Sequence, residues 1–220
     1  MAALPLPEAL AFAELLRRRR PGVLLDAGGQ RCDLYLKGTD GSLHWQGIPL
    51  GGHYFTRVLC AGAALSPARA ERVKLAYAGG RLRARSRLRV SAMLRRAASV
   101  WFARVGEALA PMPDPIPGLW LLSGGHSRLP ECSRLPAALA DASMSRLESH
   151  PSLEPLTYGE AGLPLIPGPE TLLPSHAVCF GLAQWVARLA GDGHALSHLR
   201  RLAMAAAREG YEVASAWLNL

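Results

Sequence analysis

Apolar and polar residues in the N-terminal part of the chain follow patterns that predict one helix and three strands. Apolar positions within 9–16 recur every three or four residues, which predicts an amphipathic helix. Short apolar runs at 23–25 and 34–36, followed by alternation at 43–45, predict three successive strands. Because short turns with Asp and Gly separate these strands, we expect a three-stranded antiparallel meander.

The middle of the chain changes to a helical pattern. Ser66 is typical of an N-cap and Pro67 of the first helical position, so a helix is predicted to begin there. A longer helix is predicted at 92–109, where the apolar residues keep a helical period. The four prolines within 111–117 end this helical region.

The rest of the chain is predicted to return to the sheet and then to form helices. The apolar run 119–122 predicts another buried strand, which makes the fold class α/β. A short helix broken by Pro136 is predicted at 130–142, and the proline-rich segment 149–174 is expected to be loop or edge strand. Further helices are predicted at 177–189 and beyond Gly193, to about Trp217.

Composition is that of a cytoplasmic globular protein. The 220 residues, half of them apolar, are enough for one compact domain with a substantial core. The four cysteines have neither the spacing of a zinc site nor the density of a disulfide scaffold, which indicates a reducing compartment. No run of about 18 apolar residues predicts a membrane span, and residues 1–16 lack the basic segment of a signal peptide.

The formal net charge is +8, and arginine supplies nearly all of the basic residues. Arginines are concentrated in two runs, at 17–20 and at alternating positions within 81–89. Each run is either a solvated face or a surface that contacts nucleic acid or an anionic membrane. Aromatic residues do not alternate with these arginines as they would in a groove for single strands, so nucleic acid is not the expected partner.

Two glycine turns are candidates for contact with a nucleotide. Asp26 is followed by Gly28 and Gly29, whose backbone N–H groups can approach a phosphate while the Asp26 carboxylate holds a magnesium ion. Gly124 and Gly125 follow the predicted strand 119–122 and permit close approach of a ligand such as a nucleoside. Ordinary hairpin turns and tight strand-to-helix turns use the same residues, so a purely structural role remains the alternative.

The order and spacing of these features resemble the second half of proteins in the actin, Hsp70 and sugar kinase superfamily, most closely the bacterial cell-division protein FtsA. The related pilus-assembly protein PilM is the second resemblance. The resemblance to the superfamily covers about residues 5–190 and implies an actin-like fold that binds ATP and Mg²⁺. The implied site residues are Asp26, Gly28 and Gly29 in the phosphate-2 hairpin, Gly51 and Gly52 before Thr56 at the start of the inserted subdomain, Glu71 and Lys74 beside the adenosine, and Gly124 and Gly125 in the adenosine motif.

The resemblance also implies an organisation and a role. An actin-like core would comprise residues 1–50 and 118–190, with a mostly helical inserted subdomain at 51–117 and a helical extension at 191–220. The expected partners are other actin-like subunits or cell-division proteins. FtsA proteins end in an amphipathic helix on the inner membrane, which would make residues 191–220 a possible peripheral membrane contact. We favour the other interpretation, a helix packed on its own domain, because alanine dominates its apolar face.

Departures from the family pattern affect the expected activity. Gln30, Arg31 and Cys32 stand where members usually have a small residue and threonine, and nothing ahead of Asp26 resembles the phosphate-1 hairpin. A nucleotide in this superfamily lies between the two halves, so we expect this chain alone to bind ATP poorly and not to hydrolyse it. A rival hypothesis is a basic binding module for nucleic acid or anionic lipid, in which the glycine turns are only structural.

Overall fold

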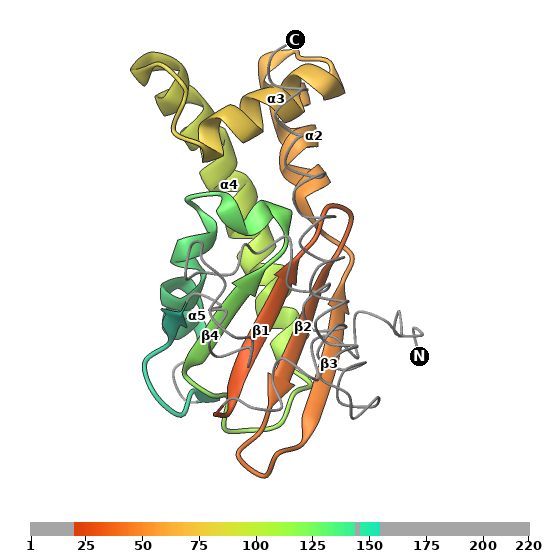
Figure 1. The fold of residues 1–220 in the computed structure, drawn as a ribbon, viewed down its shortest axis with the longest axis vertical. Helices are drawn as coiled ribbons and strands as arrows, with labels where there is room; N and C mark the ends of the chain where they lie inside the picture. The colour runs from red at the N-terminus through yellow and green to blue at the C-terminus, as the bar shows by residue number, and fades with distance from the viewer. Residues whose placement is uncertain (1–19, 144–145, 155–220) are drawn as a thin grey trace, which may run out of the picture. The chain divides into compact units, whose positions relative to one another are not determined.

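A mixed five-stranded sheet forms the centre of the computed structural model, which describes residues 20–143 and 146–154 (Figure 1). The strands lie in the order β3-β2-β1-β4-β5. The first three pair antiparallel, which confirms the predicted meander, whereas β4 pairs in parallel with both β1 and β5. The strands are β1 (Gly22–Ala27), β2 (Cys32–Lys37), β3 (Leu43–Ile48), β4 (Leu119–Ser123) and β5 (Ser152–Glu154).

Helices cover one face of the sheet and extend beyond its end. In Figure 1, α2, α3 and the first part of α4 project past the end at which β1 and β4 finish, and the rest of α4 lies against the sheet. This arrangement confirms the α/β fold class. The helices are α2 (Gly52–Ala63), α3 (Pro67–Ala78), α4 (Ala84–Leu109) and α5 (Leu135–Ser143), with 3-10 turns η1 (Gly125–Arg128) and η2 (Cys132–Arg134).

The long helix α4 begins at Ala84, and the predicted start at residue 92 was therefore too late. The N-terminal turns contain Arg85, Arg87 and Arg89, which are good helix formers but give no apolar period. The first buried side chain of the helix is Val90, where the helix begins to pack on its neighbours. The apolar pattern therefore marked the buried part of the helix rather than its full length.

The segment after β4 also differs from its prediction. Two 3-10 turns precede α5, and the predicted break at Pro136 is absent because this proline is the second residue of the helix. Proline is tolerated in the first helical turn, where its missing N–H would have no partner within the helix. Within the predicted loop or edge strand 149–174, the short edge strand β5 is confirmed.

Several predictions lie outside the described residues. They are the helix at 9–16, the helices at 177–189 and beyond Gly193, and the contact of 191–220 with its own domain or with a membrane. The described residues fall within one compact unit, Arg20–Pro155, and the predicted boundaries at 50, 117 and 190 stay predictions. None of the described helices combines the length and the apolar character that a bilayer crossing requires.

The core centres on Trp101 of α4, which is fully buried. Its ring packs edge-on against Phe55 of α2, with ring centroids 6.3 Å apart. Its indole Nε1–H donates to the Cys32 sulfur of β2 at 3.3 Å. One side chain thereby joins the sheet, α2 and α4. On the central strand β1, Leu24 and Leu25 point to opposite faces and both are fully buried, as expected for a strand with a parallel neighbour inside a sheet.

His126 of η1 lies within this aromatic cluster. Its ring centroid is 5.0 Å from that of Trp101 and 5.4 Å from that of Phe55. Burial lowers the pKa of His126 from 6.5 to about 4, because the charged imidazolium would lose its hydration. Among the described residues, Nδ1 bonds the Gly28 carbonyl, while the buried Nε2 has no hydrogen-bond partner. The neutral imidazole with Nδ1–H is therefore the form that fits.

The buried histidine predicts a pH-dependent stability. Between pH 6.5 and about 4 the unfolded chain binds a proton at His126 that the folded chain excludes. The free energy of unfolding contributed by this group should therefore fall as the pH decreases through this range, by roughly 3 kcal/mol in total. Urea unfolding of the wild type and of His126→Asn, whose amide can still donate to Gly28, measures this difference. If both proteins lose the same stability between pH 7 and pH 4.5, the prediction is wrong.

Trp101 predicts a large packing effect. Replacement by Leu leaves a cavity beside Phe55 and removes the bond to Cys32, so Trp101→Leu should lower the free energy of unfolding by about 3 kcal/mol. The neighbouring Phe102 is only partly buried, and Phe102→Leu is the matched control, expected to cost less than about 1.5 kcal/mol. Chemical denaturation at neutral pH compares the two. Equal losses would contradict the central position assigned to Trp101.

Candidate functional site

Asp26 and Gly124 meet at one end of the sheet, although they are far apart in the sequence. β1 and β4 run parallel, with Asp26 in register with Ser123, so the two strands finish side by side. Gly124 follows directly, and a Cβ added to it would lie 2.6 Å from the Asp26 carboxylate oxygen Oδ1. The acidic turn and the Gly-Gly turn therefore converge at the carboxyl ends of parallel strands, where α/β proteins commonly bind ligands.

The third glycine turn, Gly51-Gly52, packs directly on the first. The Gly52 N–H donates to the Gly28 carbonyl at 2.8 Å, and the His53 N–H donates to the Gly29 carbonyl at 2.7 Å. A Cβ added to Gly51 would lie 2.6 Å from each of these two carbonyl oxygens, so no side chain fits there. The first N–H groups of α2 are consequently bonded to the hairpin turn, which gives the helix its N-terminal partners.

His126 joins the same three turns, and the sequence analysis did not select it. Its Nδ1 donates to the Gly28 carbonyl at 3.0 Å, so that this carbonyl accepts from both His126 and Gly52. The available signal was the place of His126 directly after Gly124-Gly125, since the side chain of that residue must extend from the same turn. His53 was missed as well: its imidazole Nε2 lies 3.3 Å from the position of a Cβ at Gly29.

Gly124 and Gly125 have different surroundings. Gly124 has a φ of +84°, and a Cβ there would lie 2.4 Å from the Ala27 carbonyl oxygen, so glycine is required for the backbone contact itself. Gly125 is exposed, and among the described residues no heavy atom beyond its chain neighbours lies within 4 Å of the position of its Cβ. Of the two predicted adenosine contacts, Gly125 is the one with open space beside it.

Asp26 is the candidate ligand for a magnesium ion. It is partly exposed at the end of β1, and no group of three His, Cys, Asp or Glu side chains that could hold a metal ion occurs within residues 20–143 and 146–154. Mg²⁺ commonly keeps several waters and binds one or two carboxylates together with nucleotide phosphates. A single carboxylate beside an open glycine turn fits that mode of binding and does not fit a metal site formed by protein alone.

Glu71 and Lys74 form a network with Thr56 and the start of α2. The buried Lys74 ammonium lies 2.8 Å from the Glu71 carboxylate and donates to Thr56 Oγ1 at 2.9 Å and to the Gly52 carbonyl at 3.1 Å. The Thr56 hydroxyl donates in turn to Glu71 at 2.5 Å. The network links α3 to the first turn of α2, beside the glycine turns. Direct contact of Glu71 and Lys74 with adenosine stays a prediction.

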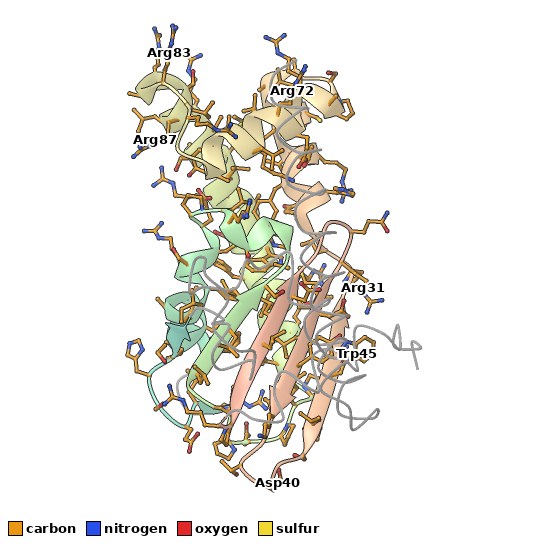
Figure 2. The ribbon with its side chains drawn as sticks, in the orientation of Figure 1. Arg31, Asp40, Trp45, Arg72, Arg83 and Arg87 are labelled. Atoms are coloured by element: carbon orange, nitrogen blue, oxygen red, sulfur yellow. The ribbon has the colours of Figure 1, made fainter. Side chains whose placement is uncertain are left out.

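Two of the residues that depart from the family pattern, Arg31 and Cys32, have structural partners. Arg31 forms an ion pair with Asp33 and lies over the Trp45 ring, 5.6 Å from its centroid (Figure 2). Cys32 donates its thiol to the Leu50 carbonyl and accepts from Trp101, and burial raises its pKa to about 12. A thiol that stays protonated at neutral pH is a poor nucleophile, so Cys32 is a packing residue.

Burial likewise raises the pKa of Cys132, whose thiol donates to the His126 carbonyl. This second buried thiol therefore packs beneath the Gly-Gly turn and does not provide a nucleophile.

A separate hollow of about 350 Å³ lies at the other end of the strands. Its lining includes Gly118 and Leu119 at the start of β4, together with Arg20, Pro21 and Glu148. None of the predicted site residues contributes to it. The hollow and the converging glycine turns are therefore distinct features at opposite ends of β1 and β4.

Comparisons with known proteins identify solved structures of similar fold. No protein-family model matches the sequence, and no curated protein matches it. PilM in the PilM-PilN type IV pilus biogenesis complex is 22% identical with a TM-score of 0.56, over 80% of this chain and 50% of that chain. The ethanolamine utilization protein EutJ from Carboxydothermus hydrogenoformans is 15% identical with a TM-score of 0.51, over 78% of this chain and 54% of that chain.

These likenesses concern the fold alone, because the identities are low. The chain spans about half the length of the two solved structures, whose matched fractions are 50% and 54%. Both neighbours have the actin-like fold, so the predicted fold is confirmed, whereas the superfamily and the specific resemblance to FtsA stay predictions. The chain has an actin-like fold.

Proposed function

We propose that this chain is an actin-like assembly module that forms one wall of an ATP site and acts by binding other proteins. The observation that carries the proposal is the convergence of Asp26, Gly51-Gly52 and Gly124-Gly125 at one end of the sheet. Three separate turns are held together by backbone contacts that tolerate only glycine at two positions. Such an arrangement leaves a carboxylate beside exposed backbone, which suits Mg²⁺ and the phosphates that accompany it.

In this proposal the described residues have distinct roles toward ATP and Mg²⁺. Asp26 holds the ion, directly or through its waters, and the backbone at Gly125 lies beside the nucleoside. Bound Mg²⁺ neutralises phosphate charge. Gly28 and Gly51 position the turn, and the Lys74 network keeps α3 against α2 beside it. A second Asp-x-Gly hairpin, absent from residues ahead of Asp26, would supply the remaining phosphate contacts.

A role in type IV pilus assembly is the form of this proposal that the comparisons favour. PilM, a protein of similar fold, occurs in a complex with PilN for pilus biogenesis. A pilus-type assembly role is as well supported as the FtsA role, because the glycine turns are common to both patterns and nothing observed is specific to cell division. We therefore propose that the chain binds a protein partner in a membrane-associated assembly, with ATP as a ligand of the completed site.

The carboxylate of Asp26 gives the first test. Asp26→Asn keeps the shape of the side chain but removes the charge that attracts Mg²⁺, so the increase in ATP affinity caused by Mg²⁺ should fall about tenfold. Isothermal titration with ATP, with and without Mg²⁺, measures the increase. Asp40→Asn is the matched control, because Asp40 is exposed on the turn between β2 and β3, at the other end of the sheet (Figure 2). Equal loss in both variants would argue against a magnesium role for Asp26.

The second test concerns the other wall of the site. A co-expressed actin-like chain that carries an Asp-x-Gly-Thr hairpin should complete the phosphate contacts, so the pair should bind ATP on the order of 100-fold more tightly than this chain alone. Fluorescence anisotropy with a labelled ATP analogue compares the pair, the single chains and the pair with Asp26→Asn. Identical affinity with and without the second chain would reject the proposal that the site is shared.

A further inference from the structure

Positive charge is concentrated in the helical part of the chain. Residues 51–106 contain eleven arginines and one lysine but a single carboxylate, that of Glu71. This segment is therefore more positive than the whole chain, whose formal net charge is +8. It comprises α2, α3 and most of α4. The rest of the chain is consequently slightly acidic, and the basicity belongs to one structural region rather than to the protein in general.

All eleven arginines are exposed, and within the described part of the chain Arg104 is the only one of them in an ion pair, with Glu107. In Figure 2, Arg72 and Arg83 lie at the projecting end of the helices, and Arg87 lies close by on α4. We refer to this surface as the basic end. Its members are Arg69, Arg72, Arg81, Arg83, Arg85, Arg87, Arg89, Arg95 and Arg96.

Like charges gathered in one place repel one another and disfavour the compact state unless an anionic partner neutralises them. The Glu71 carboxylate is already paired with the buried Lys74. Carboxylates within this segment therefore do not neutralise the basic end, which leaves it available to a polyanion outside the segment. Arginine suits phosphate in particular, because its planar guanidinium can donate two parallel hydrogen bonds.

Apolar side chains among the arginines indicate which polyanion fits best. Leu88 is 70% exposed between Arg87 and Arg89, and Leu75 of α3 is 44% exposed. The large aromatic side chains of this region, by contrast, are buried or partly buried and are not presented for stacking on bases. A nucleic-acid backbone offers phosphate but no apolar layer that Leu88 can enter, whereas the interface of an anionic bilayer offers both.

We propose that the basic end binds an anionic phospholipid surface, with arginines on lipid phosphates and Leu88 inserted among the acyl chains. This surface differs from the C-terminal segment 191–220, for which the sequence analysis weighed membrane contact against packing on the same domain. Each arginine at an anionic membrane strengthens binding about fivefold, so several together give appreciable affinity. The attraction is screened by salt, and binding should weaken between low and physiological ionic strength.

Co-sedimentation of the full chain with vesicles tests the proposal. With equal amounts of phosphatidylglycerol and phosphatidylcholine, the wild type should bind, and the double variant Arg83→Gln/Arg87→Gln should bind about 25-fold more weakly. The double variant Arg128→Gln/Arg134→Gln is the matched control, because it removes the same charge from two exposed arginines outside the basic end. It should lose less than about twofold. Circular dichroism checks that the variants remain folded.

Leu88→Ser separates a membrane from nucleic acid. The variant should weaken vesicle binding by at least about fivefold, because it removes the inserted aliphatic group, and it should leave binding to a short DNA duplex unchanged. Three results would overturn the proposal: equal binding to vesicles of phosphatidylcholine alone, equal loss in the Arg128/Arg134 control, or tighter binding to the duplex than to vesicles with no effect of Leu88. The last would identify nucleic acid as the partner.

Discussion

The arrangement of the candidate site depends on one backbone carbonyl, that of Gly28. It accepts hydrogen bonds from the Gly52 N–H at 2.8 Å and from His126 Nδ1 at 3.0 Å, and so joins the acidic turn after β1, the start of α2 and the turn after β4. The approach is close enough that a Cβ at Gly51 would overlap the carbonyls of the hairpin turn. Without these two bonds the three turns would be independent loops, and Asp26 and Gly125 would have no fixed relation to each other. The contacts therefore place the Asp26 carboxylate and the exposed Gly125 at the same end of the sheet, and we refer to this end as the rim.

The same glycine turn is connected to the projecting helices by a continuous set of bonds. Gly52 donates its N–H to Gly28 and accepts from the Lys74 ammonium of α3 through its carbonyl. A second connection comes from Tyr77, whose hydroxyl donates to the buried carboxylate of Glu131 at 2.5 Å, in the segment after β4. Because α3 is held to the core at two points, the helical region is an extension of the sheet domain rather than a flexibly attached arm. A partner bound at the basic end would consequently be held in a defined orientation relative to the rim of glycine turns.

The sequence predicted the sheet and the turns well because their signals are local. Apolar runs and Asp-Gly turns mark β1, β2, β3 and β4 within a few residues, and each strand of the meander pairs with its neighbour in sequence. The start of α4 and the position of Pro136 within a helix were missed because the apolar period reports burial and not helix length. His126 and the Thr56 network depend on contacts between residues 15 to 98 positions apart, which no local pattern contains. The glycine motifs also cannot decide between the resemblances to FtsA and to PilM, because the sequence analysis found them in both patterns.

The rim and the basic end lie far enough apart for a nucleotide at the rim and a membrane at the basic end to be bound at the same time. The helix α2 starts at Gly52, in contact with the glycine turn, and its 12 residues extend roughly 18 Å toward the projecting end. The positive end of its dipole faces the carbonyls of Gly28 and Gly29, which satisfies the helix terminus and strengthens the contact. A membrane at the far end would lie about two Debye lengths from Asp26 at physiological ionic strength, so the two sites would influence each other little through charge alone. Any coupling between them would have to pass through packing, along the path from Gly52 to Lys74 and α3.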